Sequence, residues 1–183
     1  MKKLAVVCVL GLLLSQTAMF ARRNKRPDGF AVGLGFGFGG DWDNGYDREN
    51  GMGWQFLLKK PQLPLFWTLN LELGRDWLAC SAIGDYYVID EPIDALDGLG
   101  WFFGVGGYVS VFGFDNDAFT GTVIDLGVHA PIGINYRFDF GLELLLDVAV
   151  NIGLGIIQTG DFANMPHFPD GGWGIDFGAR YWF

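Results

Sequence analysis

Cysteine and histidine are scarce in this sequence, which holds 2 of each among 183 residues. Cys8 lies in an apolar N-terminal stretch that we expect to be removed, so Cys80 would stand alone in the mature chain. A single cysteine can form no disulfide within the chain, and it excludes a metal site built on cysteine thiolates. Neither His129 nor His167 lies in a motif with a serine or an acid, so we expect no enzyme.

Basic residues and long apolar runs are also few. The chain carries 12 Lys and Arg against 21 Asp and Glu, a formal net charge of −9, and an acidic protein is a poor partner for nucleic acid. Beyond the N-terminal region no run of ~20 apolar residues occurs. The body of the chain therefore offers no candidate for a membrane-spanning helix.

The first 21 residues are typical of a secretory signal peptide. Two lysines form a basic start, residues 4–14 form an apolar stretch, and Ala21 ends a region suited to cleavage. Residues 22–28 then form a short basic segment that we expect in the periplasm. An uncleaved N-terminal anchor is the alternative interpretation of this region.

Glycine, by contrast, is abundant, with 29 residues in the chain against a usual share of ~7%. In GFAVGLGFGFGG, residues 29–40, a bulky apolar residue alternates with glycine or alanine. Such period-two alternation predicts a β-strand with one apolar face and one nearly bare face. The apolar face of this first strand, which we expect to contact lipid, consists of Phe30, Val32, Leu34, Phe36 and Phe38.

The same alternation recurs along the chain in eight segments, each long enough for the ~9–11 tilted residues that cross a bilayer. No helical periodicity of about 3.6 residues competes with it. Short turns alternate with longer polar loops, two of which are predicted over residues 41–51 and 158–172. We therefore predict an all-β fold, an eight-stranded antiparallel up-and-down transmembrane β-barrel formed by residues 29–183.

Two short motifs suggest other functions. Residues 35–40, GFGFGG, match the dinucleotide-binding pattern G-x-G-x-x-G, but neither a helix nor an acid follows where that site needs one. The acidic run Asp41–Gly45 resembles the start of a calcium loop, yet Tyr46 and Met52 stand where an EF-hand needs glycine and glutamate. We expect no cofactor and no metal site.

Charged residues indicate which face of the barrel points outward. A soluble barrel with an apolar interior is the alternative, but it would need charge on its outer face, and the second face of the first strand carries only alanine and glycine. A charge in the middle of a bilayer costs about 2–4 kcal/mol for Lys or Arg, so we assign the ionisable face to the lumen. The predicted polar cluster of the lumen consists of Glu72, Asp125, His129, Arg137, Glu143, Asp147, Asp176 and Arg180.

The turn between the sixth and seventh strands sets their register. A hairpin through residues 138–141 places Arg137 opposite Glu143, both inward, where opposite charges stabilise each other. Arg180 should lie at similar depth and complete a cluster at the periplasmic end. Pro131 removes a donor from the strand ladder, so we expect a β-bulge near residues 130–133.

The signal peptide, the eight alternating segments and the ending GIDFGARYWF resemble the small outer-membrane β-barrels of the OmpX/OmpW/OmpA-barrel type. This resemblance implies a location in the outer membrane, contact with outer-membrane lipid, and insertion by the barrel-assembly machinery. The residues similar to the C-terminal assembly signal of such proteins are Phe177, Ala179, Tyr181 and Phe183.

Eight strands enclose an interior that side chains can fill, so we expect a filled, polar lumen and no open pore. The favoured function is a rigid barrel that displays surface loops for interaction or envelope integrity, with a surface ligand that the sequence does not identify. A narrow channel for small solutes, as in OmpW-like proteins, is the alternative. A lipid-modifying outer-membrane enzyme is a third hypothesis.

Overall fold

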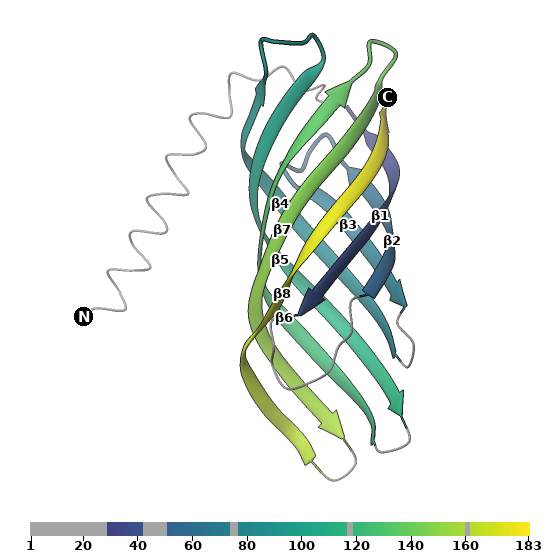
Figure 1. The fold of residues 1–183 in the computed structure, drawn as a ribbon, viewed down its shortest axis with the longest axis vertical. Helices are drawn as coiled ribbons and strands as arrows, with labels where there is room; N and C mark the ends of the chain where they lie inside the picture. The colour runs from purple at the N-terminus through teal and green to yellow at the C-terminus, as the bar shows by residue number, and fades with distance from the viewer. Residues whose placement is uncertain (1–28, 42–50, 74–76, 117–118, 160–161) are drawn as a thin grey trace, which may run out of the picture.

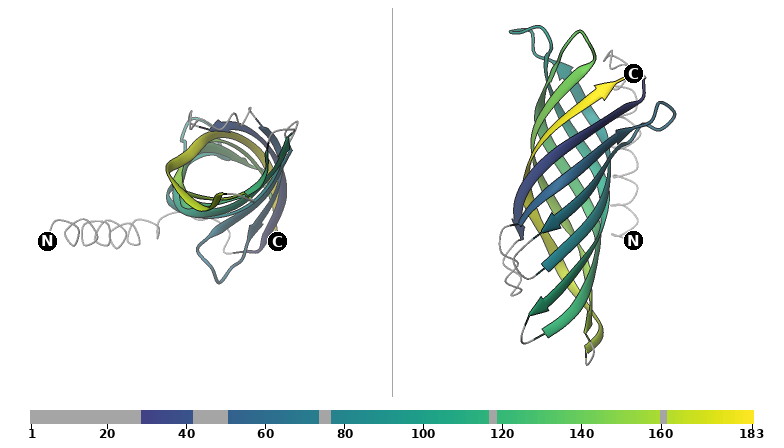
Figure 2. Two further views of the ribbon diagram at one scale, coloured as in Figure 1. Left: turned by 90° about the horizontal axis from the view of Figure 1, so that it is seen from below. Right: turned by 90° about the vertical axis from the view of Figure 1, so that its right-hand side faces the viewer.

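A computed structural model describes residues 29–41, 51–73, 77–116, 119–159 and 162–183. These residues form eight β-strands, each antiparallel to the next, and β1 also pairs with β8, which closes the sheet into a barrel (Figure 1). Seen along its axis, the barrel is a closed ring (Figure 2). This confirms the predicted all-β fold. The strands are β1 (Ala31–Asp41), β2 (Gly51–Lys59), β3 (Phe66–Leu73), β4 (Trp77–Pro92), β5 (Leu99–Asn116), β6 (Phe119–Arg137), β7 (Leu142–Thr159) and β8 (Phe162–Trp182).

The two ends of the barrel differ. The connections β2–β3, β4–β5 and β6–β7 lie at the end that carries the C-terminus, which we call the C-terminal end (Figure 1). The opposite end, where β5 meets β6 and β7 meets β8, is the hairpin end. The β6–β7 turn is tight because Gly141 adopts a φ of 93°, which glycine reaches without strain, and its N–H donates to the Phe138 carbonyl at 3.0 Å. None of the described residues belongs to a helix long and apolar enough to span a membrane.

The two faces of the wall divide as the alternation predicts. Leu34 is 67% exposed on the outside, Phe30 and Phe38 are exposed as well, and Val32 and Phe36 are half-buried between outward neighbours. The glycines between them face the lumen. Every strand presents large apolar side chains outward, for example Leu34, Trp54, Leu71, Leu78, Val109, Ile132, Val150 and Phe177.

The strands β5 to β8 are longer than the sequence predicts, with 18, 19, 18 and 21 residues. The loop predicted over residues 158–172 is wrong, because β7 continues to Thr159 and β8 begins at Phe162. Pairing of β8 with β1 starts only at Gly172, so among the described residues the earlier part of β8 has one free edge. A free edge tolerates Pro166, which a central strand would not. Most of the other predicted loop, residues 42–50, lies outside the described residues.

The prediction of a β-bulge near Pro131 is also wrong. Pro131 stays in register with Ala149 of β7, and β6 keeps one register with β5 on both sides of it. Register shifts lie instead in β4, between Tyr87 and Ile89, and in the pairing of β7 with β8, between Gly153 and Gly155 and between Ile157 and Gln158. Gly104 of β5 accommodates the proline ring, because a Cβ there would lie 3.0 Å from both Pro131 Cγ and Tyr87 Cδ1. The missing side chain, rather than a bulge, makes room for the proline.

Candidate functional site

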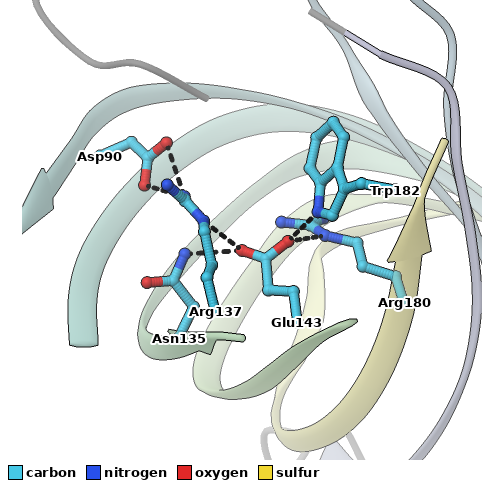
Figure 3. A network of polar contacts seen from close by, with 6 residues as sticks. All are labelled: Asp90, Asn135, Arg137, Glu143, Arg180 and Trp182. Carbon is cyan, nitrogen blue, oxygen red and sulfur yellow. Dashed lines mark hydrogen bonds and ion pairs between the residues drawn. The ribbon is translucent and has the colours of Figure 1, made fainter. Parts of the chain in front are cut away.

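The lumen near the C-terminal end is organised around Glu143 of β7, whose side chain is fully buried (Figure 3). Its register partners are Arg137 on β6 and Arg180 on β8, so the carboxylate lies between two guanidinium groups. Arg180 Nε donates to Oε2 at 2.5 Å, and Arg137 Nε donates to Oε1 at 3.1 Å. Asn135 Nδ2 and Trp182 Nε1 each donate a further bond at 2.7 Å. The register predicted for the β6–β7 hairpin is therefore confirmed.

Asp90 extends this network to a fourth strand. Arg137 Nη2 donates to the two carboxylate oxygens of Asp90 on β4 at 3.0 and 3.2 Å. Two carboxylates and two guanidinium groups then balance, which is the condition under which buried charges are tolerated. The network joins β4, β6, β7 and β8 at the C-terminal end, so its role is structural. We call it the clamp, and its residues are Asp90, Asn135, Arg137, Glu143, Arg180 and Trp182 (Figure 3).

Aromatic rings occupy the lumen beside the clamp. Tyr87 is stacked between Phe66 and Phe102, with ring centroids 4.2 and 4.5 Å apart. Phe102 is fully buried, and the Arg180 Cζ lies 4.5 Å from the centroid of the Phe66 ring. A guanidinium in this position gains a cation–π attraction in addition to its ion pair. The stack and the arginine reach inward from β3, β4, β5 and β8 and fill this part of the barrel.

Towards the middle of the barrel, His129 and Asp85 form a buried polar pair. His129 Nδ1 lies 2.8 Å from Asp85 Oδ1, and each residue is about 5% exposed. Their strands, β6 and β4, are not neighbours, but both residues are register partners of Gly106 on the intervening β5. A Cβ at Gly106 would overlap the Asp85 carboxylate. Glycine on β5 is thus what allows the two side chains to meet.

A second pair uses the glycine-rich strand β1 in the same way. Gln55 Nε2 on β2 donates to Asp176 Oδ1 on β8, and β1 lies between these two strands. A Cβ at Gly37 would overlap the Asp176 carboxylate, and one at Gly35 would lie 2.6 Å from Gln55 Oε1. The bare inner face of β1 therefore provides the space for the Gln55–Asp176 bond.

The His129–Asp85 and Gln55–Asp176 pairs form a layer across the lumen, and one cavity lies on each side of this layer. The outer cavity, of about 120 Å³, extends towards the hairpin end and includes Glu72 and Asp125 in its wall. The inner cavity, of about 40 Å³, extends towards the C-terminal end and includes Asp147 and Arg180. Residues that line both cavities, and so form the layer between them, are Gln55, Ile83, His129 and Asp176.

All eight residues of the predicted polar cluster lie on the lumen side, where they divide into four groups. Arg137, Glu143 and Arg180 belong to the clamp. His129 and Asp176 lie in the dividing layer, Asp147 in the inner cavity, and Glu72 and Asp125 in the outer cavity.

Several partners of these residues were outside the predicted cluster. Asp90 was missed because the extra residue in β4 shifts it from the outward to the inward position, opposite buried Phe102. Asp85 and Gln55 occupy inward positions of the alternation, so the pattern could have included them. Their partners could not be found from the pattern, because they lie two strands away.

The other predicted site residues lie on the outer face or outside the described part of the chain. Phe177, Tyr181 and Phe183 are exposed and Ala179 is half-buried, and their role as an assembly signal stays a prediction. Cys80 is a free thiol on the outer face. Outside the described residues lie the predicted signal peptide and basic segment, residues 1–28, and most of the calcium-loop motif. The side chain of His167 is likewise not described. Within the described ranges, no three His, Cys, Asp or Glu side chains group closely enough to hold a metal ion.

No protein-family model matches the chain, and no curated protein matches it. Among solved structures, the barrel is similar to Neisserial surface protein A (NspA), with a TM-score of 0.59 at 11% identity over 84% of this chain and 97% of that one. A major outer membrane protein from Thermus thermophilus matches with a TM-score of 0.43 at 13% identity over 84% and 99% of the two chains. The likeness to the neisserial protein concerns the fold: this chain folds as a closed eight-stranded antiparallel β-barrel, similar to that surface protein.

Proposed function

We propose that this protein is a non-conducting integral protein of the outer membrane, whose rigid barrel presents its hairpin end for surface interaction or envelope integrity. The observation that carries the proposal is the filled lumen at the C-terminal end. There the Phe66–Tyr87–Phe102 stack and the Glu143 clamp take up the space that a pore would need. The apolar outer surface on all eight strands supports a bilayer as the surrounding medium.

The inner cavity is small compared with a conducting path. Its volume is about 40 Å³, and a buried water needs roughly 10–15 Å³ of such space, so the cavity holds about three waters. Its wall includes Tyr87 and Arg180, which belong to the stack and the clamp. Ions entering from the hairpin end would meet these groups before reaching the other side.

Strand length supports a role at the hairpin end. A strand needs ~9–11 residues to cross a bilayer, whereas β5 to β8 have 18 to 21. The surplus lies at the hairpin end, where the β5–β6 and β7–β8 hairpins extend beyond β1 and β2 (Figure 1). Paired strands hold such extensions more rigidly than a loop of the same length.

The conductance of the refolded protein in a planar bilayer tests the closed lumen. We expect no single-channel steps from the natural sequence. A Tyr87→Ala/Arg180→Ala variant, which removes the middle ring of the stack and its cation, should conduct once its folding has been verified by its gel mobility without boiling. Steady conductance from the natural sequence would contradict the proposal and favour the narrow channel, for which the polar outer cavity is the supporting observation.

Cysteine labelling in intact cells tests which end of the barrel faces outward. In a Cys80→Ser background, Phe168→Cys at the hairpin end and Phe140→Cys in the β6–β7 turn form a matched pair, since these phenylalanines are 69% and 61% exposed. A maleimide that does not cross membranes should label position 168 and leave position 140 unlabelled. Labelling at position 140 alone would show that the hairpin end faces the periplasm, which would overturn the display function.

A further inference from the structure

We propose that the outer cavity binds a small organic dication, a molecule with two protonated amino groups. The cavity of about 120 Å³ reaches Gly40 and Gly51, where β1 and β2 end, so it lies at the hairpin end of the lumen. It is separate from the clamp and from the stack that fill the opposite end. This site goes beyond the display function, which needs no ligand inside the barrel.

The charge of the cavity wall selects a cation. Three carboxylates line it, from Glu72, Asp125 and Asp176, and no lysine or arginine is among the described residues around it. His129 also lines the cavity, but its Nδ1 is engaged by Asp85. The wall thus presents excess negative charge in a partly enclosed space, where electrostatic attraction is stronger than in open water.

The distribution of these acids favours separated charges over a metal ion. Glu72 lies on β3, Asp125 on β6 and Asp176 on β8, so no two of them share a strand or lie on adjacent strands. Within the described residues no three potential ligands gather closely enough to hold a metal. Two amino groups joined by a short chain can each approach a different carboxylate, which a single compact ion cannot do.

The hydrogen-bonding groups of the wall also favour a ligand that supplies hydrogen-bond donors. When ionised, the three carboxylates of the wall are acceptors only. An ammonium group has three donors and no acceptor, which complements a wall of carboxylates. Glycines on β1, β2 and β8 leave the space open, since no side chain fills it from those positions.

Isothermal titration calorimetry of the refolded full chain in a non-ionic detergent tests the proposal, with putrescine as the probe and butanediol as its neutral counterpart. We expect saturable heat for putrescine and none for butanediol. Glu72→Gln and Asp125→Asn should each weaken putrescine binding about tenfold or more, the usual consequence of losing one charged hydrogen-bond partner. Asp139→Asn, an equal change of charge in the exposed β6–β7 turn, should leave binding unchanged.

A filling variant tests the site without altering any charge. A Cβ at Gly174 would meet no heavy atom closer than 3.7 Å, so the first side-chain atom of Gly174→Leu fits at a position that lines the cavity. This variant should fold and lose putrescine binding. The proposal is overturned by any of four results: no saturable binding, equal binding of butanediol, binding that survives Gly174→Leu, or preferential binding of magnesium or calcium.

Discussion

Arg180 on β8 donates a 2.5 Å hydrogen bond from Nε to Glu143 Oε2, and the two residues are also direct register partners between β7 and β8. The register itself therefore sets the ion pair, so neither side chain has to reach along the barrel to find the other. Arg137 holds the same position on the other side of Glu143. One acid on the central strand thus joins three consecutive strands.

Glu143→Gln should lower the free energy of unfolding by about 3–5 kcal/mol, because it leaves the buried guanidinium of Arg180 and the half-buried guanidinium of Arg137 facing a neutral amide. The change preserves the shape of the side chain, so the loss reports on charge rather than on packing. Urea unfolding of the protein in lipid vesicles measures it. Asp139→Asn, at an exposed position in the adjacent turn, is the control and should change stability by less than about 0.5 kcal/mol. Equal stability of the two variants would show that the clamp does not stabilise the barrel.

Gly37→Ala should destabilise the barrel by about 1–3 kcal/mol, because the added methyl overlaps the Asp176 carboxylate and breaks the bond from Gln55. Gly174→Ala is the matched control on the same inner wall, where the new Cβ would lie 3.7 Å from Asp176 Oδ2. The control should be neutral or slightly stabilising, since alanine restricts the unfolded chain. The same unfolding assay compares them. A cost of the same size at both positions would mean that the inner wall tolerates no added side chain at either glycine. The loss at Gly37 would then not report on the Gln55–Asp176 hydrogen bond.

The period-two alternation accounts for the strands and for which face of each points inward. It could predict the Arg137–Glu143 pair because a short turn fixes the register of a hairpin from the sequence alone. Alternation fails where the chain departs from period two. The extra residue between Tyr87 and Ile89 reverses the face of Asp90, and nothing in the local sequence marks that bulge.

The alternation cannot predict contacts between strands that are not neighbours. Gln55 and Asp176 are 121 residues apart in the chain and meet only because β1 closes against β8 in one register. The pattern predicts which face of the sheet a residue is on. It does not predict the stagger of the strands in the closed sheet, and that stagger sets the position of each residue along the barrel axis. The length of β8 was missed because residues 158–172 were predicted as a polar loop. In the structure β8 begins at Phe162, and a strand with a free edge tolerates Pro166.

Phe102→Ala should lower the free energy of unfolding by about 3–5 kcal/mol, since it empties a fully buried position and removes one face of the Tyr87 stack. Phe140→Ala is the control, because Phe140 is 61% exposed in the β6–β7 turn. Unfolding in vesicles, followed by the change in gel mobility, measures both. If both substitutions had the same small effect, the lumen would be hydrated at Phe102 rather than packed.

Ile132→Lys tests whether the outer face of the barrel contacts hydrocarbon. Ile132 is 52% exposed on β6 and lies five residues before the strand ends at Arg137, which places it well inside the span of ~9–11 residues that crosses a bilayer. A lysine there should cost about 2–4 kcal/mol in vesicles, whereas Phe140→Lys in the turn should cost about 0–1 kcal/mol. The contrast separates depth in the membrane from the loss of an apolar side chain, since both variants replace an exposed apolar residue by the same cation. Equal and small costs would mean that water, rather than lipid, surrounds this face, and the soluble barrel would have to be reconsidered.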